Sequence, residues 1–172
     1  MIAWILALLT ATEPNAPWKD TYPATATAMA ESAQDEPLFA GKDGPKKTAA
    51  LYVSLSWFEA RHNPRAVGDH GHSFCLGQIN DTNFKGLGIA SGEELFDVRK
   101  CLHAVNRMVR TSFRVCARAE LEDRLSWYAG GGDGCRVNMK SKHRMRKALW
   151  LVATYPMAPE AERDALLVLP GH

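Results

Sequence analysis

The sequence predicts a mainly α-helical, single-domain protein with one loop-rich segment. Three stretches, at about residues 48–61, 95–117 and 141–155, repeat apolar residues at the spacing of one helix face. Residues 64–90 are rich in glycine and other turn formers and show no strict alternation, so we expect at most a short strand or hairpin there. A chain of 172 residues is long enough to bury a core within one domain.

The first elements precede the longest apolar segment. Residues 2–9 are apolar but too few to span a bilayer, and they lack a basic n-region and a convincing cleavage site. We expect a first helix that packs on the core and ends before Pro14 and Pro17; a degenerate signal peptide is the alternative. The Ala-rich residues 24–34 predict a second helix, and residues 42–45 predict a turn.

The segment from Thr48 predicts a helix that ends near Asn63, because the residue before Pro64 is disfavoured in helical conformation. One face is apolar, and a neighbouring, more polar stripe is expected to line a cleft. The apolar face contains Leu51, Leu55 and Phe58, and the polar stripe contains Tyr52, Ser56 and Glu59.

The second half of the chain predicts further helices. Residues 91–94 resemble a capped helix start, and a long helix is expected from about Leu95 to Ala117. Another helix is expected from Leu121 to Trp127, before the glycines at 130–132, and a basic helix at 141–155. Its expected inner face contains Met145, Ala148, Leu149 and Val152. A short helix is expected at 159–167.

These elements predict three regions: a helical lead-in at 1–47 that packs on the core, a catalytic domain at 48–155, and a tail at 156–172. Composition agrees with a folded chain, since 46% of residues are hydrophobic and 23% are charged. No internal repeat or long heptad pattern is present.

Charge is spread unevenly although the net charge is only +2. The densest basic cluster has no acidic residue between its members, which are Arg136, Lys140, Lys142, Arg144, Arg146 and Lys147. Such a cluster is either a solvated helix face or a contact surface for a polyanion. Bacterial cell wall and nucleic acid are both polyanionic.

Glu59 is the main candidate for chemistry. It stands in the last expected helical turn, beside aromatic residues and facing the loop-rich segment. A negative charge is unfavourable at a helix C-terminus, and apolar surroundings disfavour the charged form of a carboxyl group. A carboxylic acid in such a place can protonate a leaving oxygen. An ordinary surface carboxylate at a helix end is the alternative.

Four boxes in order resemble the soluble lytic transglycosylases, whose catalytic fold is shared with goose-type lysozymes and several phage endolysins. The boxes are Trp57-Phe58-Glu59, Asn63-Pro64-x-Ala66-Val67, Leu76-Gly77-Gln78-Ile79 and Trp127-Tyr128-Ala129-Gly130-Gly131. The resemblance covers roughly residues 48–135. Two positions depart from the family pattern: Ala60 stands in place of the family's serine and Ala129 in place of its asparagine.

The resemblance implies a lysozyme-like fold and cleavage of the β-1,4 bond between N-acetylmuramic acid and N-acetylglucosamine in peptidoglycan. In the family mechanism, Glu59 would protonate the glycosidic oxygen and then deprotonate the muramic C6 hydroxyl, which leaves a 1,6-anhydro product. No cofactor or metal is implied. The expected partner is the glycan strand, bound by a monomer that neither binds nucleic acid nor inserts stably into a membrane.

Four further residues are candidates for the site. Gln78 and Asn80 carry amides, which suit sugar hydroxyls and N-acetyl groups. Tyr128 matches the family's tyrosine, and its hydroxyl is expected to point at the cleft near Glu59. Asp69 could be a second carboxylate that positions water, although an aspartate that caps its own turn is the simpler interpretation.

Two other motifs are set aside. His70 and His72 with Asp69 suggest a metal, but no further ligands follow at a recognised spacing. The glycines at 130–132 suggest phosphate binding, but no Gly-Lys-Ser/Thr follows them.

The four cysteines are Cys75, Cys101, Cys116 and Cys135. Cys101 and Cys116 would lie about 22 Å apart on one helix, which is too far for a disulfide. Two connectivities remain, and we favour Cys75–Cys101 with Cys116–Cys135 because each joins neighbouring segments. Disulfides indicate an oxidising location: periplasmic, secreted or phage-associated. Four reduced thiols in a cytoplasmic protein are the alternative.

Three functional alternatives remain. The first is a hydrolase on the same fold. The second is a wall-binding or virion structural domain without turnover, which the two departures favour. The third is a nucleic-acid-binding domain built on the basic segment, which has few aromatic residues for base stacking.

Overall fold

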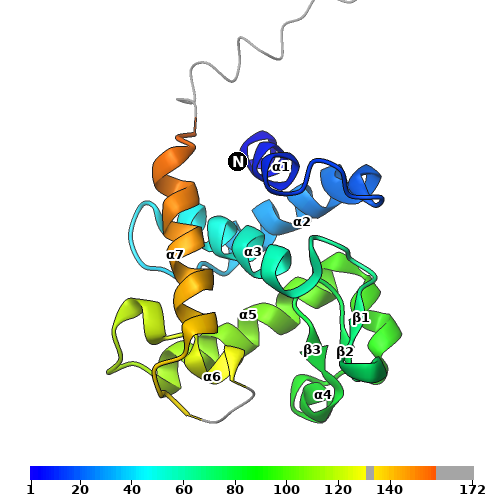
Figure 1. The fold of residues 1–172 in the computed structure, drawn as a ribbon, viewed down its shortest axis with the longest axis vertical. Coiled ribbons are helices and arrows are strands. Elements are labelled where there is room, and N and C mark those ends of the chain that lie inside the picture. Colours follow the sequence, from blue (N-terminus) through cyan, green and yellow to red (C-terminus); the bar gives the residue numbers. More distant parts are fainter. Residues whose placement is uncertain (131–133, 158–172) are drawn as a thin grey trace, which may run out of the picture.

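The computed structural model describes residues 1–130 and 134–157, which are mainly helical with a small three-stranded antiparallel sheet (Figure 1). This confirms the mainly helical character expected from the sequence. The helices are α1 (Ile2–Thr12), α2 (Tyr22–Asp35), α3 (Gly44–Ala60), α4 (Phe84–Leu87), α5 (Val98–Val115), α6 (Ser126–Ala129) and α7 (Met139–Thr154). The strands are β1 (Val67–Gly68), β2 (Ser73–Phe74) and β3 (Ile79–Asn80).

Helix α3 runs through the middle of the molecule, where α1, α2 and α7 pack around it (Figure 1). Every residue from Thr48 to Ser56 is buried, as expected for a helix enclosed on all sides. The expected polar stripe is therefore wrong in two of its three members. Tyr52 accepts a hydrogen bond from Asn106 Nδ2 at 2.6 Å inside the core, and Ser56 is buried as well.

The first two helices pack on this core, as expected for the N-terminal segment. Trp4 of α1 donates its indole N–H to the Tyr155 carbonyl at 2.6 Å, which joins α1 to the end of α7. Proline stands in the first turn of α2 and of α3, where its missing N–H breaks no helical hydrogen bond. Both helices consequently begin earlier than the apolar pattern indicated.

Helix α3 ends at Ala60, one residue before the expected end at about Arg61, and His62 then turns into the core. Arg61 and His62 both have left-handed backbone conformations, with φ of 50° and 63°. The buried His62 ring then bonds Ser56 Oγ through Nδ1 at 2.7 Å and Thr12 Oγ1 through Nε2 at 2.8 Å. These bonds offset the backbone strain and fasten α1 to the end of α3.

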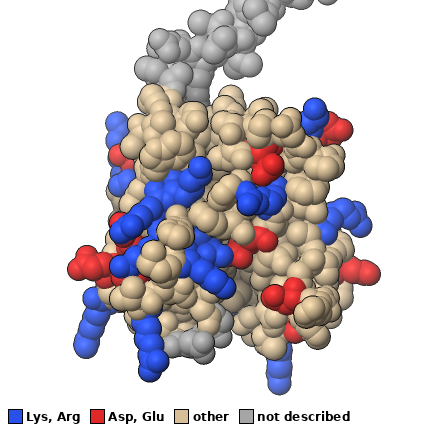
Figure 2. Space-filling view, viewed as in Figure 1, with Lys and Arg blue, Asp and Glu red and all other residues tan. Residues whose placement is uncertain are grey.

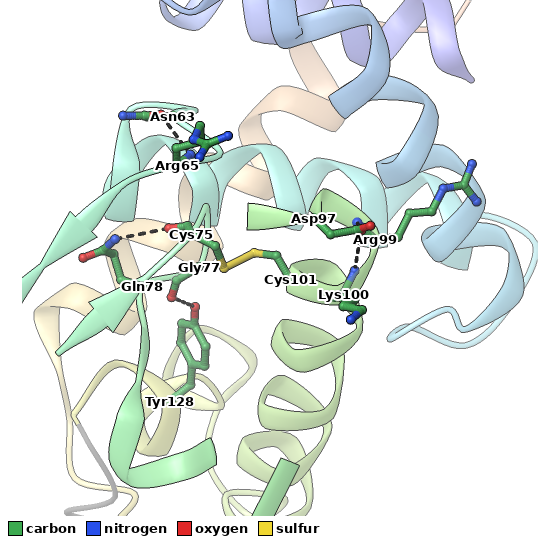
Figure 3. Close-up of a disulfide and its surroundings, with 10 residues drawn as sticks. All are labelled: Asn63, Arg65, Cys75, Gly77, Gln78, Asp97, Arg99, Lys100, Cys101 and Tyr128. Carbon is green, nitrogen blue, oxygen red and sulfur yellow. Dashed lines mark hydrogen bonds between the residues drawn. A yellow bond between two sulfur atoms is a disulfide. The ribbon is translucent and has the colours of Figure 1, made fainter. Parts of the chain in front are cut away.

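The loop-rich segment contains the sheet, in the order β1-β2-β3. Val67 pairs with Phe74, and Ser73 pairs with Asn80. The Cys75–Cys101 disulfide fastens this segment to α5 (Figure 3). A second disulfide joins Cys116 to Cys135. The favoured connectivity is thus confirmed.

Two predicted helices are divided in the structure. Residues Gly92–Phe96 form a 3₁₀ helix, and α5 begins only at Val98, where Asp97 accepts hydrogen bonds from two backbone N–H groups. The expected helix at 121–127 is a 3₁₀ helix, Leu121–Asp123, followed by α6. The tail helix expected at 159–167 lies outside the described residues. Among the described helices, none has the length and apolar character needed to cross a membrane.

Candidate functional site

A cleft of about 500 Å³ lies between the sheet region and the α6–α7 side of the molecule. It brings together every residue that the sequence singled out for the site: Glu59, Asp69, Gln78, Asn80 and Tyr128. The remaining lining residues are mostly polar. They are Ser73, Gly77, Ile79, Thr82, Asn83, Met108, Ala129, Lys140 and Arg144.

Glu59 projects from the last turn of α3 and forms an ion pair with Arg144 of α7. Glu59 Oε1 accepts a hydrogen bond from Arg144 Nε at 2.7 Å. The side chains are only 17% and 9% exposed, so solvent screens the pair weakly. No motif in the sequence marks this cation beside the candidate carboxyl group.

Arg144 is held in place from several sides. Its Nη1 donates to the Lys140 carbonyl at 2.9 Å, and its guanidinium lies over the Phe58 ring. Ser54 of α3 donates to the Arg144 carbonyl at 2.6 Å, so the two helices are joined at this level. Arg144 is therefore a preorganised part of the cleft.

Assigning Arg144 to the exposed basic cluster was thus wrong. Figure 2 shows Lys and Arg side chains gathered on the face that carries α7, but Arg144 itself is 7% exposed. A signal was present in the sequence, because Arg144, Ala148 and Leu151 follow the i, i+4, i+7 spacing of the inner face. Two other members of the cluster have acidic partners: Lys142 pairs with Asp123 and Arg146 with Glu122.

Tyr128 reaches the cleft from α6 and donates its hydroxyl proton to the Gly77 carbonyl at 2.8 Å (Figure 3). Burial and the nearby charge of Glu59 raise the pKa of Tyr128 well above its usual value, and Arg144 opposes them. A Cβ at position 77 would collide with Val105 and crowd the Tyr128 hydroxyl. Glycine in the Leu76–Ile79 box is thus required by close packing.

Gln78 lies on the sheet side of the cleft with a left-handed backbone, φ 48°. Its amide Nε2 donates to the Cys75 carbonyl at 3.2 Å, and its Oε1 lies where a Cβ at Gly68 would be (Figure 3). The amide is therefore fixed by the disulfide-bonded segment beneath it, and Gly68 provides the room.

Asp69 and Asn80 line the cleft and also stabilise the loop. Asp69 accepts a hydrogen bond from Ser73, four residues later. Asn80 caps the 3₁₀ helix Asp81–Asn83 by accepting from the Thr82 N–H, and its amide N–H donates to Ser73 Oγ at 3.3 Å. Both side chains have a structural partner, and both face the space in front of Glu59.

The two histidines of the loop do not lie on an extended strand. His70 is in a left-handed conformation within a 3₁₀ turn, so the segment is not extended. His72 bonds Asp81 through Nδ1 at 2.7 Å, and this carboxylate raises the pKa of His72. Over residues 1–130 and 134–157, no group of three or more His, Cys, Asp and Glu side chains is arranged to hold a metal ion.

No protein-family model, curated protein or solved structure matches this chain.

Proposed function

We propose that the cleft cleaves the β-1,4 bond between N-acetylmuramic acid and N-acetylglucosamine in peptidoglycan, on a lysozyme-like fold. The observation that carries this proposal is the convergence of Glu59, Gln78, Asn80 and Tyr128 on one polar cleft, although they are spread over three separate motifs. Polar lining suits a polyhydroxylated ligand, and no cofactor is required.

In this proposal Glu59 is both acid and base. As an acid it protonates the glycosidic oxygen; as a carboxylate it then removes the proton of the muramic C6 hydroxyl, which attacks the anomeric carbon. Arg144 Nε occupies Glu59 Oε1 at 2.7 Å. In the proposed mechanism Arg144 releases this oxygen for the acid step once the glycan fills the cleft.

An internal hydroxyl is the favoured nucleophile because it is already held beside the reacting carbon. The product would carry 1,6-anhydromuramic ends. Asp69 lines the same cleft, and this placement favours a second candidate: a hydrolase that uses Asp69 to position water. Asp69→Asn separates the two, since it retains most activity in the transglycosylase and loses it in the hydrolase.

The Glu59–Arg144 pair also favours a third candidate, a wall-binding domain that holds glycan without turnover. Clearing of a suspension of purified cell walls by the pure protein tests this. A falling turbidity supports an enzyme. Walls that bind the protein but stay turbid support the binding domain.

The two disulfides are compatible with an oxidising location outside the cytoplasm. We place the protein in the periplasm, in the secreted fraction or on a phage particle, where it would meet its substrate as a monomer. Fractionation with non-reducing electrophoresis tests this placement, because a reduced cytoplasmic pool would contradict it.

A further inference from the structure

The Glu59 cleft continues into a basic groove along α5. A neighbouring depression of about 390 Å³ shares two lining residues, Asn83 and Met108, with the cleft. A further depression of about 270 Å³ shares Arg110, Thr111 and Arg114 with that one. The three hollows are therefore neighbours in a row that leads away from Glu59, an arrangement that suits a polymer.

Three arginines define this groove: Arg107, Arg110 and Arg114, all on the exposed side of α5. Among residues 1–130 and 134–157, no Asp or Glu lines either of the two groove depressions. Within the described residues, none of the three arginines has a carboxylate within ion-pair distance, whereas Arg144 and Arg146 both do. The groove thus carries positive charge that the described part of the chain does not neutralise.

Two of the guanidinium groups are held in place by neutral partners. Arg107 donates to the carbonyls of Leu87 and Gly86 at 2.9 and 3.1 Å. Arg110 donates from Nε to Asn106 Oδ1 at 2.6 Å and from Nη2 to the Pro37 carbonyl at 3.2 Å. These bonds orient the groups without cancelling their charge, and each guanidinium keeps N–H donors for a ligand.

We propose that this groove is a secondary binding site for the carboxylate groups carried by a glycan strand whose cleaved bond lies at Glu59. Arginine binds a carboxylate through two parallel N–H donors, and the strand carries carboxylates at regular intervals. Trp127 also lines the groove, and an aromatic side chain can pack against a sugar. The site thereby distinguishes an acidic strand from a neutral one. This inference rests on the proposed function, because that function supplies the strand.

Binding to the Glu59→Gln protein tests the inference without requiring cleavage. The ligand is a soluble glycan strand from which the peptides have been removed at the lactyl amide, so that each muramic residue keeps one carboxylate. Chitooligosaccharides of equal length are the neutral comparison. Arg114→Gln is the central variant, because no described hydrogen bond fixes Arg114 and its loss should spare the fold. Arg118→Gln, an exposed arginine outside the groove, is the matched control.

We expect Arg110→Gln/Arg114→Gln to weaken strand binding about tenfold at low salt and Arg114→Gln alone to weaken it less. Chitooligosaccharide binding should change less than twofold, and Arg118→Gln should change neither. Equal strand affinity in the Glu59→Gln protein with and without Arg110→Gln/Arg114→Gln would overturn the inference. So would tighter, arginine-dependent binding of an oligonucleotide of equal charge, which would assign the groove to nucleic acid. If strand binding depends on the arginines but the wild type cuts no strand, the proposed cleavage is wrong and the proposed binding site in the groove is supported.

Discussion

Glu59 and Arg144 meet at 2.7 Å across the interface between α3 and α7, although 85 residues separate them in the chain. The pair stands in the cleft wall, with little solvent around it. It joins the helix interface to the carboxyl group that we propose as the catalytic acid and base.

Removing one partner of this pair should destabilise the fold more than removing both. Arg144→Met leaves Glu59 without its cation, and we expect a loss of about 3 kcal/mol in the free energy of unfolding. Glu59→Gln/Arg144→Met should recover part of that loss, with a coupling of about 1–3 kcal/mol in a double-mutant cycle measured by urea unfolding. Additive effects would mean that the pair contributes nothing in solution.

His62 should make stability fall in acid. Burial and the charges of Arg61 and Lys147 lower its pKa from 6.5 to about 3. His62 therefore takes up a proton below about pH 6.5 in the unfolded state but only near pH 3 in the folded state. Because the unfolded state binds more protons between these values, the free energy of unfolding falls as pH falls from about 6.5 to about 3. At pH 5 we expect His62 alone to cost about 2 kcal/mol relative to pH 7.

Urea unfolding at pH 7 and pH 5 measures this effect. His62→Gln should reduce the difference between the two pH values, and His143→Gln, an exposed histidine, should retain it. A wild-type difference that His62→Gln leaves unchanged would assign the acid sensitivity to other groups.

Gly77→Ala should damage the cleft selectively. Its Cβ would collide with Val105 and press on the Tyr128 hydroxyl, so we expect a loss of about 1–3 kcal/mol and a weakened Tyr128–Gly77 bond. Gly86→Ala is the control, since a Cβ there meets nothing within 4 Å. Thermal unfolding of the two variants compares them; equal melting temperatures would contradict the close packing.

The two disulfides should differ in their effect on the cleft. Cys75→Ser/Cys101→Ser opens a loop of 26 residues and frees the segment whose Cys75 carbonyl holds Gln78. We expect a stability loss of about 3 kcal/mol, as for Cys116→Ser/Cys135→Ser, but a larger loss of glycan affinity. Calorimetric unfolding measures the stability loss of each variant, and titration with chitooligosaccharide measures its affinity. Equal affinity losses in the two variants would contradict a special role for Cys75.

Much of the fold was predictable because helical spacing and cysteine positions are local or nearly local features. The helices at 2–9, 24–34 and 141–155 and the disulfide pairs match the structure, whereas the loop-rich segment has a third strand beyond the short hairpin considered. The failures come from long-range packing. Tyr52 and Ser56 look polar in the sequence, yet both are buried. Tyr52 bonds Ser32 of α2 and Asn106 of α5, and Ser56 bonds His62.

The candidate site shows the same limit. Glu59, Gln78, Asn80 and Tyr128 were found through short motifs, and the structure places them in one cleft. Arg144 has no motif, and only the packing of α7 on α3 brings it to Glu59. The earlier end of α3 likewise depends on Thr12, which bonds His62 from 50 residues away.

Mass spectrometry of the soluble fragments released from purified peptidoglycan by the wild type and by Glu59→Gln tests the central claim most directly. We expect the wild type to release fragments with 1,6-anhydromuramic ends, lighter by one water than hydrolytic ends. We expect folded Glu59→Gln to release fewer of these fragments by a factor of about one hundred or more, because an amide cannot donate the proton. Undiminished release by a folded Glu59→Gln protein, or no release by the wild type, would contradict the assignment of Glu59 as the catalytic residue.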